Sequence, residues 1–222
     1  MLSKIKCPIA KQAHKSPNKT AIYTTTKTVS YLELHQLIHF YQENLPKAET
    51  LCLHNTQDLK TIFLIFAALR AQKLIYILPP KCSSSEMKKL ETSQFANLNA
   101  LKQLKVKLNN TNLASKIPSW DLQRPATLIQ SSGTATSPKR VCHSLSNHYY
   151  SYLGLLESIP FTSKECWALM LPLHHISGLS ILFRMAYAKA SLYLIDDYKQ
   201  NNWPSLNIIS HASNNYNIIK FR

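Results

Sequence analysis

Glycine is scarce in this sequence: only three of the 222 residues are glycine, at positions 133, 154 and 178. An average usage of ~7% would give about fifteen. Glycine tolerates positive φ and lets other atoms approach the backbone closely. A chain with so few glycines is expected to need those that it keeps, so Gly133, Gly154 and Gly178 are the first positions to inspect.

Signals for secretion and membrane insertion are also missing. No apolar run approaches the ~18 residues of a membrane-spanning helix, and the longest candidate, residues 62–69, ends at Arg70. Residues 1–8 contain no apolar signal-peptide core. The five cysteines are scattered and form no C-x-x-C pair, which predicts reduced thiols rather than a disulfide framework or a zinc cluster. We therefore expect a cytoplasmic protein with no membrane partner.

Acidic residues are few, with 11 Asp and Glu against 26 Lys and Arg, so the formal net charge is +15. Disorder is excluded because 45% of the residues are hydrophobic, which is enough to build a core. The charge permits nucleic-acid binding, but no RNA-binding, zinc-finger or recognition-helix pattern accompanies it. A surface of solvated lysines that attracts small anionic substrates explains the charge equally well, and nucleic acid is the less favoured alternative.

Strand and helix signals alternate along the chain. Short β-branched or apolar runs predict strands, and the capping boxes Ser30-x-x-Glu33 and Ser83-x-x-Glu86 mark helix starts. The expected strands cover residues 20–24, 51–54, 74–78, 126–130, 167–171 and 191–195. Besides the two capped helices, helices are expected from Asn55 or Thr56 to about residue 71, over 145–158 and over 176–188. The alternation predicts an α/β fold, with mostly parallel sheets and flanking helices.

The domain organisation expected from this pattern has four parts. Residues 1–96 form a first α/β subdomain, and residues 97–124, rich in Asn, Lys and Leu, form a connecting segment. Residues 125–213 form a second α/β subdomain that carries a polar loop. Residues 214–222 are expected to be an unstructured tail.

The loop of residues 131–139, with the sequence SSGTATSPK, directly follows an expected strand. Hydroxyls, exposed backbone N–H groups, a glycine and a lysine are the groups that bind phosphate oxygens. The spacing is not that of a Walker loop, because Pro138 precedes Lys139. An ordinary surface loop rich in Ser and Thr is the alternative interpretation.

This loop resembles the phosphate-binding signature of the adenylate-forming enzymes, the acyl-CoA synthetase and luciferase superfamily, which reads [TS]-[SG]-G-[ST]-T-G-x-P-K-G. A second segment, residues 171–179 with the sequence LPLHHISGL, resembles the motif P-[LM]-[FY]-H-x-x-G of that superfamily. His174 stands in its aromatic position and His175 at its histidine. Weaker matches upstream extend the resemblance over roughly residues 16–212.

Within the superfamily, the chain is most similar to the o-succinylbenzoate–CoA ligase family of menaquinone biosynthesis. The pointers are residues 147–150, residues 166–182 and Arg184. The resemblance implies the N-terminal part of the adenylate-forming fold. It also implies a ligase reaction in which a carboxylate attacks the α-phosphate of ATP, pyrophosphate leaves, and the thiol of CoA then displaces AMP. Its small-molecule partners are a carboxylate, ATP with Mg²⁺, and CoA.

The same resemblance assigns roles to individual residues. The ATP phosphates would be held by Ser131, Ser132, Gly133, Thr134 and Lys139. His175 would be the catalytic residue beside the adenylate, and the acyl pocket would include His175, Ser177, Gly178 and Arg184. We expect Arg184 to pair with a second carboxylate of the substrate, with a surface arginine as the alternative. Adjacent His174 and His175 lack further ligands nearby, so no metal site is expected.

Several segments of the superfamily are missing from the sequence. The adenine-binding Y-G-x-T-E segment, the T-G-D segment and the C-terminal domain are absent, and residues 214–222 do not resemble the family. We hypothesise a frameshift or premature stop and expect a fragment that is inactive alone and self-associates through an unpaired strand edge. Thr136, Arg140 and Gln72 replace family glycines. A non-catalytic remnant or a binding module of another acyl-CoA ligase is the alternative.

Overall fold

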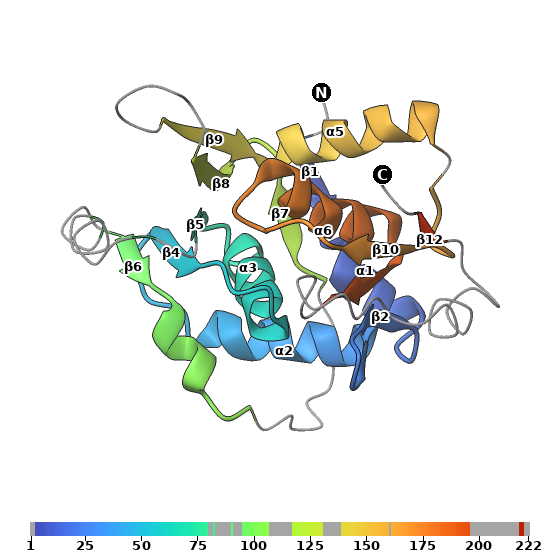
Figure 1. Cartoon of the computed structure of the whole chain (residues 1–222), viewed down its shortest axis with the longest axis horizontal. Helices are drawn as coiled ribbons and strands as arrows, with labels where there is room; N and C mark the ends of the chain where they lie inside the picture. Colours follow the sequence, from blue (N-terminus) through green and yellow to red (C-terminus); the bar gives the residue numbers. More distant parts are fainter. Residues whose placement is uncertain are drawn as a thin grey trace.

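The structure is a computed structural model, and it describes residues 3–79, 82, 90, 95–106, 117–130, 139–159 and 161–195, together with the backbone of residues 218–219. Two five-stranded sheets and one two-stranded sheet make up the described part, with helices packed between and around them (Figure 1). The α/β class with mostly parallel strands is confirmed.

The first sheet has the strand order β6-β4-β5-β8-β9. Its strands are β4 (Thr50–His54), β5 (Leu74–Leu78), β6 (Phe95–Asn97), β8 (Pro125–Gln130) and β9 (Arg140–Ser144). The first four run parallel, and β9 returns antiparallel to β8 as an edge strand. Helix α3 (Leu59–Arg70) connects β4 to β5, as expected for a parallel crossover.

The second sheet has the order β12-β10-β11-β2-β3. Its strands are β2 (Thr20–Tyr23), β3 (Thr28–Ser30), β10 (Cys166–Leu169), β11 (Ser191–Leu194) and β12 (Ile218–Ile219). Helix α6 (Ile176–Ala188) connects the parallel strands β10 and β11, and β2 joins β11 in parallel. The backbone of β12 pairs with β10, and the remaining residues of the expected 214–222 tail lie outside the described residues.

The remaining elements complete the layers. A two-stranded antiparallel sheet joins β1 (Lys4–Lys6) to β7 (Ser119–Asp121), and the other helices are α1 (Pro8–Lys15), α2 (Tyr31–Glu43), η1 (Asn99–Gln103) and α5 (Leu145–Ser158). Each five-stranded sheet therefore takes strands from both sides of the expected connecting segment 97–124. In the described part of the chain, no helix is both long and apolar enough to cross a membrane.

Two helices form the centre of the hydrophobic core. In α3 every residue from Thr61 to Arg70 is buried, and in α6 every residue from Gly178 to Ala188 is buried except Arg184. A helix that is apolar on all sides has to be covered on all sides. Figure 1 accordingly shows α3 and α6 in the interior of the picture, with α2 and α5 outside them.

The N-caps of α2 and α3 show which helix starts the local sequence pattern predicts and which it does not. The predicted capping box of α2 is confirmed: Glu33 N–H donates to Ser30 Oγ at 3.2 Å, and Ser30 N–H donates to Glu33 Oε2 at 2.7 Å. The prediction that Asn55 or Thr56 caps α3 is wrong, because Asp58 Oδ1 accepts the Thr61 N–H at 2.7 Å. The predicted capping box at residues 83–86 lies outside the described residues.

Candidate functional site

The expected phosphate loop lies in the connection between β8 and β9. Gln130 at the end of β8 pairs with Arg140 at the start of β9, so the intervening residues close an antiparallel hairpin at the carboxyl end of β8. In sheets with parallel strands this edge is where ligands bind. Ser131, Ser132, Gly133 and Thr134 lie outside the described residues, whereas Lys139 is described and is exposed.

Arg140 lies on the face of the first sheet beside this loop. Its guanidinium carbon is 5.2 Å from the ring centroid of Tyr76 and 5.9 Å from that of Phe95. Tyr76 Oη donates to Gln130 Oε1 at 3.1 Å, which joins β5 to the last residue of β8. The sequence indicated Arg140 only as a replaced glycine, and the structure adds a cation held against two aromatic rings.

The second motif forms the N-terminus of α6. His175 is the N-cap residue, with extended backbone angles, an exposed side chain and no side-chain cap hydrogen bond. The ring of His174 lies beside it, with the two ring centroids 4.1 Å apart. The first turn of α6 therefore has no side-chain cap among the described residues, and a helix N-terminus favours negative charge.

A hydrogen bond between Asn55 and His174 connects the two sheets. Asn55 follows β4 of the first sheet, and its Nδ2 is 3.0 Å from Nδ1 of His174, which follows β10 of the second sheet. With the amide in this orientation, Nδ1 accepts and the ring proton is on Nε2. Burial, and after it the neighbouring His175, lowers the pKa of His174, so the neutral ring that this bond needs is favoured.

Further contacts hold the same strand ends together. Gln57 Nε2 donates to the carbonyl oxygen of Leu169, the last residue of β10, at 2.8 Å. Asn55 N–H donates to the carbonyl oxygen of Leu78 at 2.9 Å, which ties it to the end of β5. Asn55 is buried, and its Oδ1 has no hydrogen-bond partner among the described residues. Sequence reasoning did not find Asn55 and Gln57 as residues of the site, because neither belongs to a sequence motif associated with it.

Gly178 allows a close approach, and the approaching atoms are those of this chain's own backbone. A Cβ at this position would lie 2.3 Å from the carbonyl oxygen of Pro172 and 2.5 Å from that of Leu171. No side chain fits there without movement of backbone. Gly178 therefore sets how the second motif folds back on α6, which in turn positions His174 and His175.

Arg184 is not an ordinary surface arginine. It is half-buried on α6, and its guanidinium carbon is 5.5 Å from the ring centroid of Trp167 on β10. Its Nε is buried without a hydrogen-bond partner among the described residues, and burial lowers the pKa of the guanidinium. Ser177, seven residues earlier, lies on the same side of α6. Between them, Ser180 Oγ donates to the carbonyl oxygen of Ser177 at 2.9 Å, a hydrogen bond within α6.

The described ranges contain no group of three or more His, Cys, Asp or Glu residues that could hold a metal ion. The site described so far consists of a hairpin loop with an adjoining Lys139, an open helix N-terminus with two histidines, and a half-buried arginine. Lys139 and the N-terminus of α6 lie at the carboxyl ends of strands from two sheets, and a lysine and a helix N-terminus both favour negative charge.

Residues 48–212 match the family model described as AMP-binding enzyme, which covers more than half of the chain. The chain belongs to the AMP-binding enzyme family. A curated relative is the 2-succinylbenzoate–CoA ligase of Listeria innocua, 25% identical over 214 residues that cover 86% of this chain and 45% of the relative. The chain thus spans less than half the length of the curated relatives that it matches.

Solved structures support the same fold. The o-succinylbenzoate CoA synthetase (MenE) of Bacillus subtilis in complex with the acyl-adenylate intermediate OSB-AMP matches with a TM-score of 0.72 and 20% identity, covering 96% of this chain and 47% of that one. The same protein in complex with ATP and magnesium ion matches with a TM-score of 0.73 and 20% identity, covering 96% and 48%. At this identity the likeness establishes the fold.

Proposed function

We propose that this chain is part of an ATP-dependent ligase that activates an aromatic dicarboxylate of the 2-succinylbenzoate type and transfers it to the thiol of CoA. The observation that carries the proposal is the joining of strand ends from two sheets through Asn55 and His174. The bond supports a site in which the N-terminus of α6 and the β8–β9 loop act on the same ligand. The curated relatives are 2-succinylbenzoate–CoA ligases, which supports the substrate class.

Each group has a role in this proposal. Lys139 supplies a positive charge to the ATP phosphates beside the loop residues Ser131, Ser132, Gly133 and Thr134. His175 lies next to the adenylate at the positive end of α6. Negative charge that develops on an oxygen during the reaction is stabilised there. A solved relative is in complex with ATP and magnesium ion. Magnesium would neutralise phosphate charge here too.

Arg184 would determine the choice of a dicarboxylate. Its guanidinium has an unpartnered Nε and is held over Trp167, so a carboxylate that pairs with it meets a fixed donor. Ser177, at the start of the same face of α6, would line the path between this pair and the adenylate. Gly178 would keep the wall of the acyl pocket in place through its contact with Pro172 and Leu171.

Calorimetric titration of this chain with ATP and, separately, with o-succinylbenzoate tests the proposal. We expect Lys139→Met to weaken ATP binding about tenfold, and Arg184→Met to weaken binding of o-succinylbenzoate about tenfold without affecting benzoate. Lys164→Met, an exposed lysine after α5, is the control with the same change of charge. Equal binding by all three variants would contradict the assigned site.

A binding module without turnover is a second candidate. Release of pyrophosphate from ATP in the presence of o-succinylbenzoate and CoA separates the two candidates. Release supports the ligase, whereas binding of both ligands without release supports the module. None of the five cysteines forms a disulfide, which supports a reducing compartment, and we propose the cytoplasm.

A further inference from the structure

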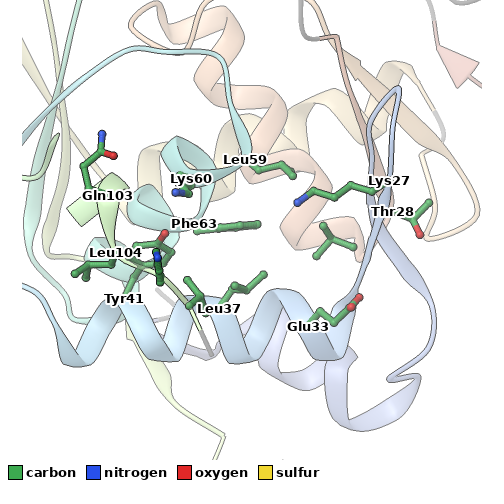
Figure 2. A pocket seen from close by; sticks show the side chains of 13 residues that line it. Lys27, Thr28, Glu33, Leu37, Tyr41, Leu59, Lys60, Phe63, Gln103 and Leu104 are labelled. Carbon is green, nitrogen blue, oxygen red and sulfur yellow. The ribbon is translucent and has the colours of Figure 1, made fainter. Parts of the chain in front are cut away.

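The candidate site described above, which includes Lys139 and the N-terminus of α6, is called the strand-end site from here on. A pocket with a volume of about 530 Å³ is lined by other residues (Figure 2). It lies between α2, the start of α3, the β2–β3 hairpin and the residues that follow η1. None of the residues assigned to nucleotide or acyl binding lines it. A volume of this size is typical of small-molecule sites.

The floor of the pocket is apolar because two helices contribute matching stripes. Leu37 and Tyr41 are four residues apart on α2, and Leu59 and Phe63 are four residues apart on α3, so each pair lies on one side of its helix. The rings of Tyr41 and Phe63 stack with their centroids 6.3 Å apart. Figure 2 shows Leu37 and Tyr41 rising from α2 toward Phe63.

The rim of the pocket is positively charged. Three exposed lysines, Lys27, Lys60 and Lys105, reach it from three different elements. The described residues that line the pocket include one carboxylate, that of Glu33, which already accepts the Ser30 N–H at 2.7 Å in the capping box of α2. The lysines therefore outnumber the acid, and the rim favours an anionic group.

Tyr41 adds a hydrogen-bond donor that nothing in the described residues uses. The residue is fully buried, and its hydroxyl has no partner in that part of the chain. Burial, and after it the carboxylate of Asp58, raises the pKa of this phenol, so the O–H stays protonated and can donate. A buried polar group without a partner costs free energy, and an acceptor on a ligand would remove that cost.

We propose that this pocket binds a fatty acid of medium chain length, about eight to twelve carbons, with the apolar chain on the floor formed by α2 and α3. The carboxylate accepts the Tyr41 hydroxyl proton in a hydrogen bond and faces the lysines of the rim. The proposal goes beyond the ligase function and does not rest on it, because neither ATP nor the strand-end site takes part.

Titration of the full chain with decanoate, followed by methyl NMR, tests the site. We expect saturable shifts of the methyl signals of Leu37, Leu59 and Leu104, all of which line the pocket. Decanol has the same apolar chain without the charge, and it should bind at least about tenfold more weakly. Absence of shifts at these leucines, or equal binding of decanol, would overturn the proposal.

Variants separate the pocket from other sites. Tyr41→Phe removes only the unpartnered hydroxyl, so the fold should be kept while decanoate affinity falls about tenfold. Lys105→Met should weaken binding several-fold, and the exposed control Lys164→Met should not. Arg184→Met should leave decanoate binding unchanged. If instead Arg184→Met abolishes binding and Tyr41→Phe does not, the fatty acid occupies the strand-end site and the proposal fails.

Discussion

Helices α5 and α6 pack against each other, yet they are built in opposite ways. At the start of α5, Ser144 Oγ accepts the Asn147 N–H at 3.3 Å and Asn147 Oδ1 accepts the Ser144 N–H at 2.8 Å, whereas α6 starts at His175 without any side-chain cap. Only three residues of α5 are buried, while α6 is buried almost throughout. The well-capped helix is the outer one, and the uncapped helix carries the candidate site.

This difference shows where each helix obtains its stability. The ends of α5 are satisfied locally, so its sequence specifies the helix without much help from the core. The stability of α6 comes from burial, which leaves its N-terminus available to a ligand. Changes at corresponding positions of the two helices should therefore have opposite consequences.

The largest effect is expected at the glycines of the two helices. Gly178→Ala in α6 places a Cβ against the carbonyl oxygens of Pro172 and Leu171, and backbone has to move. We expect a loss of about 3 kcal/mol in the free energy of unfolding, measured by urea denaturation.

Gly154→Ala in α5 is the matched control. Apart from the backbone of α5 itself, no described atom lies within 4 Å of the added Cβ, and alanine is the better helix former, so we expect a gain of about 0.5–1 kcal/mol. A loss in both variants, or a loss in neither, would show that the two helices do not differ in the way described.

The contact that joins the helices should depend on pH. His148 of α5 is buried, stacks on Phe183 of α6 with ring centroids 3.8 Å apart, and lies with Nε2 2.9 Å from Thr127 Oγ1. Burial, and after it His143, lowers the pKa of His148 to about 3. The unfolded chain binds a proton near pH 6.5 and the folded chain does not, so stability is full above pH 6.5 and declines as pH falls toward 3.

Between pH 7 and pH 5 this one group should remove about 2 kcal/mol from the free energy of unfolding. His148→Gln keeps a hydrogen-bonding side chain for Thr127 and removes the titration, so its stability should fall less over this range. His35, buried against Arg70 on the other side of the core and with a pKa also lowered to about 3, gives a parallel test through His35→Gln. An unchanged pH dependence in both variants would contradict the assignment.

The link from α6 to the first sheet should be weaker than either of these. Asn55→Ala removes the bond to His174 and relieves the buried Oδ1 at the same time, so we expect a loss of about 1 kcal/mol. The pKa of His174, measured by NMR, should move toward its ordinary value as the ring becomes more accessible. An unchanged His174 titration would show that Asn55 does not hold the ring.

The two N-termini offer a test with opposite signs. Ser144→Ala opens the capping box of α5 and should cost about 1 kcal/mol. His175→Asp should add about the same amount, because its extended backbone suits a cap and a carboxylate is favoured at the positive end of α6. The same substitution should weaken ATP binding by repulsion. Thermal unfolding of both variants measures the pair, and shifts in the same direction would contradict the comparison.

The smallest effect is expected at the C-termini. Lys189 ends α6 with φ of 55°, a left-handed conformation that glycine adopts at lower cost, so Lys189→Gly should gain up to about 1 kcal/mol. Ile159 ends α5 in extended conformation, where glycine brings only extra freedom to the unfolded chain. Ile159→Gly should therefore lose stability, and urea denaturation of the two variants should give opposite signs.

The sequence predicted those features of the fold that depend on neighbouring residues, and it failed where residues far apart in the sequence interact. The capping box of Ser30 and Glu33 spans four residues, so pattern alone found it. Asn55 looked like a helix cap by the same reasoning, but its side chain binds His174, 119 positions away, and Asp58 caps the helix. Strand β9, with its polar sequence, was missed because it becomes a strand only by pairing with β8.

The candidate site divides in the same way. His175 and Gly178 came from one continuous motif, Arg184 was a separate match five residues after it, and all three lie on or next to α6. Asn55, Gln57 and the stacking of Arg140 depend on which strands are neighbours, and hydrophobic pattern does not determine strand order. The phosphate-binding role of Ser131, Ser132, Gly133 and Thr134 stays a prediction.

The pairing of β2 with β11 has a consequence for folding during synthesis on the ribosome. Thr20, whose carbonyl oxygen accepts the Ser191 hydroxyl proton in a hydrogen bond, lies 171 positions before that serine. At a synthesis rate of about 5–20 residues per second, the β2–β3 hairpin waits roughly 10 to 35 seconds for the strand beside it. During that interval its edge is open to any other nascent strand, so the chain has its greatest need of a chaperone before residue 191 has emerged.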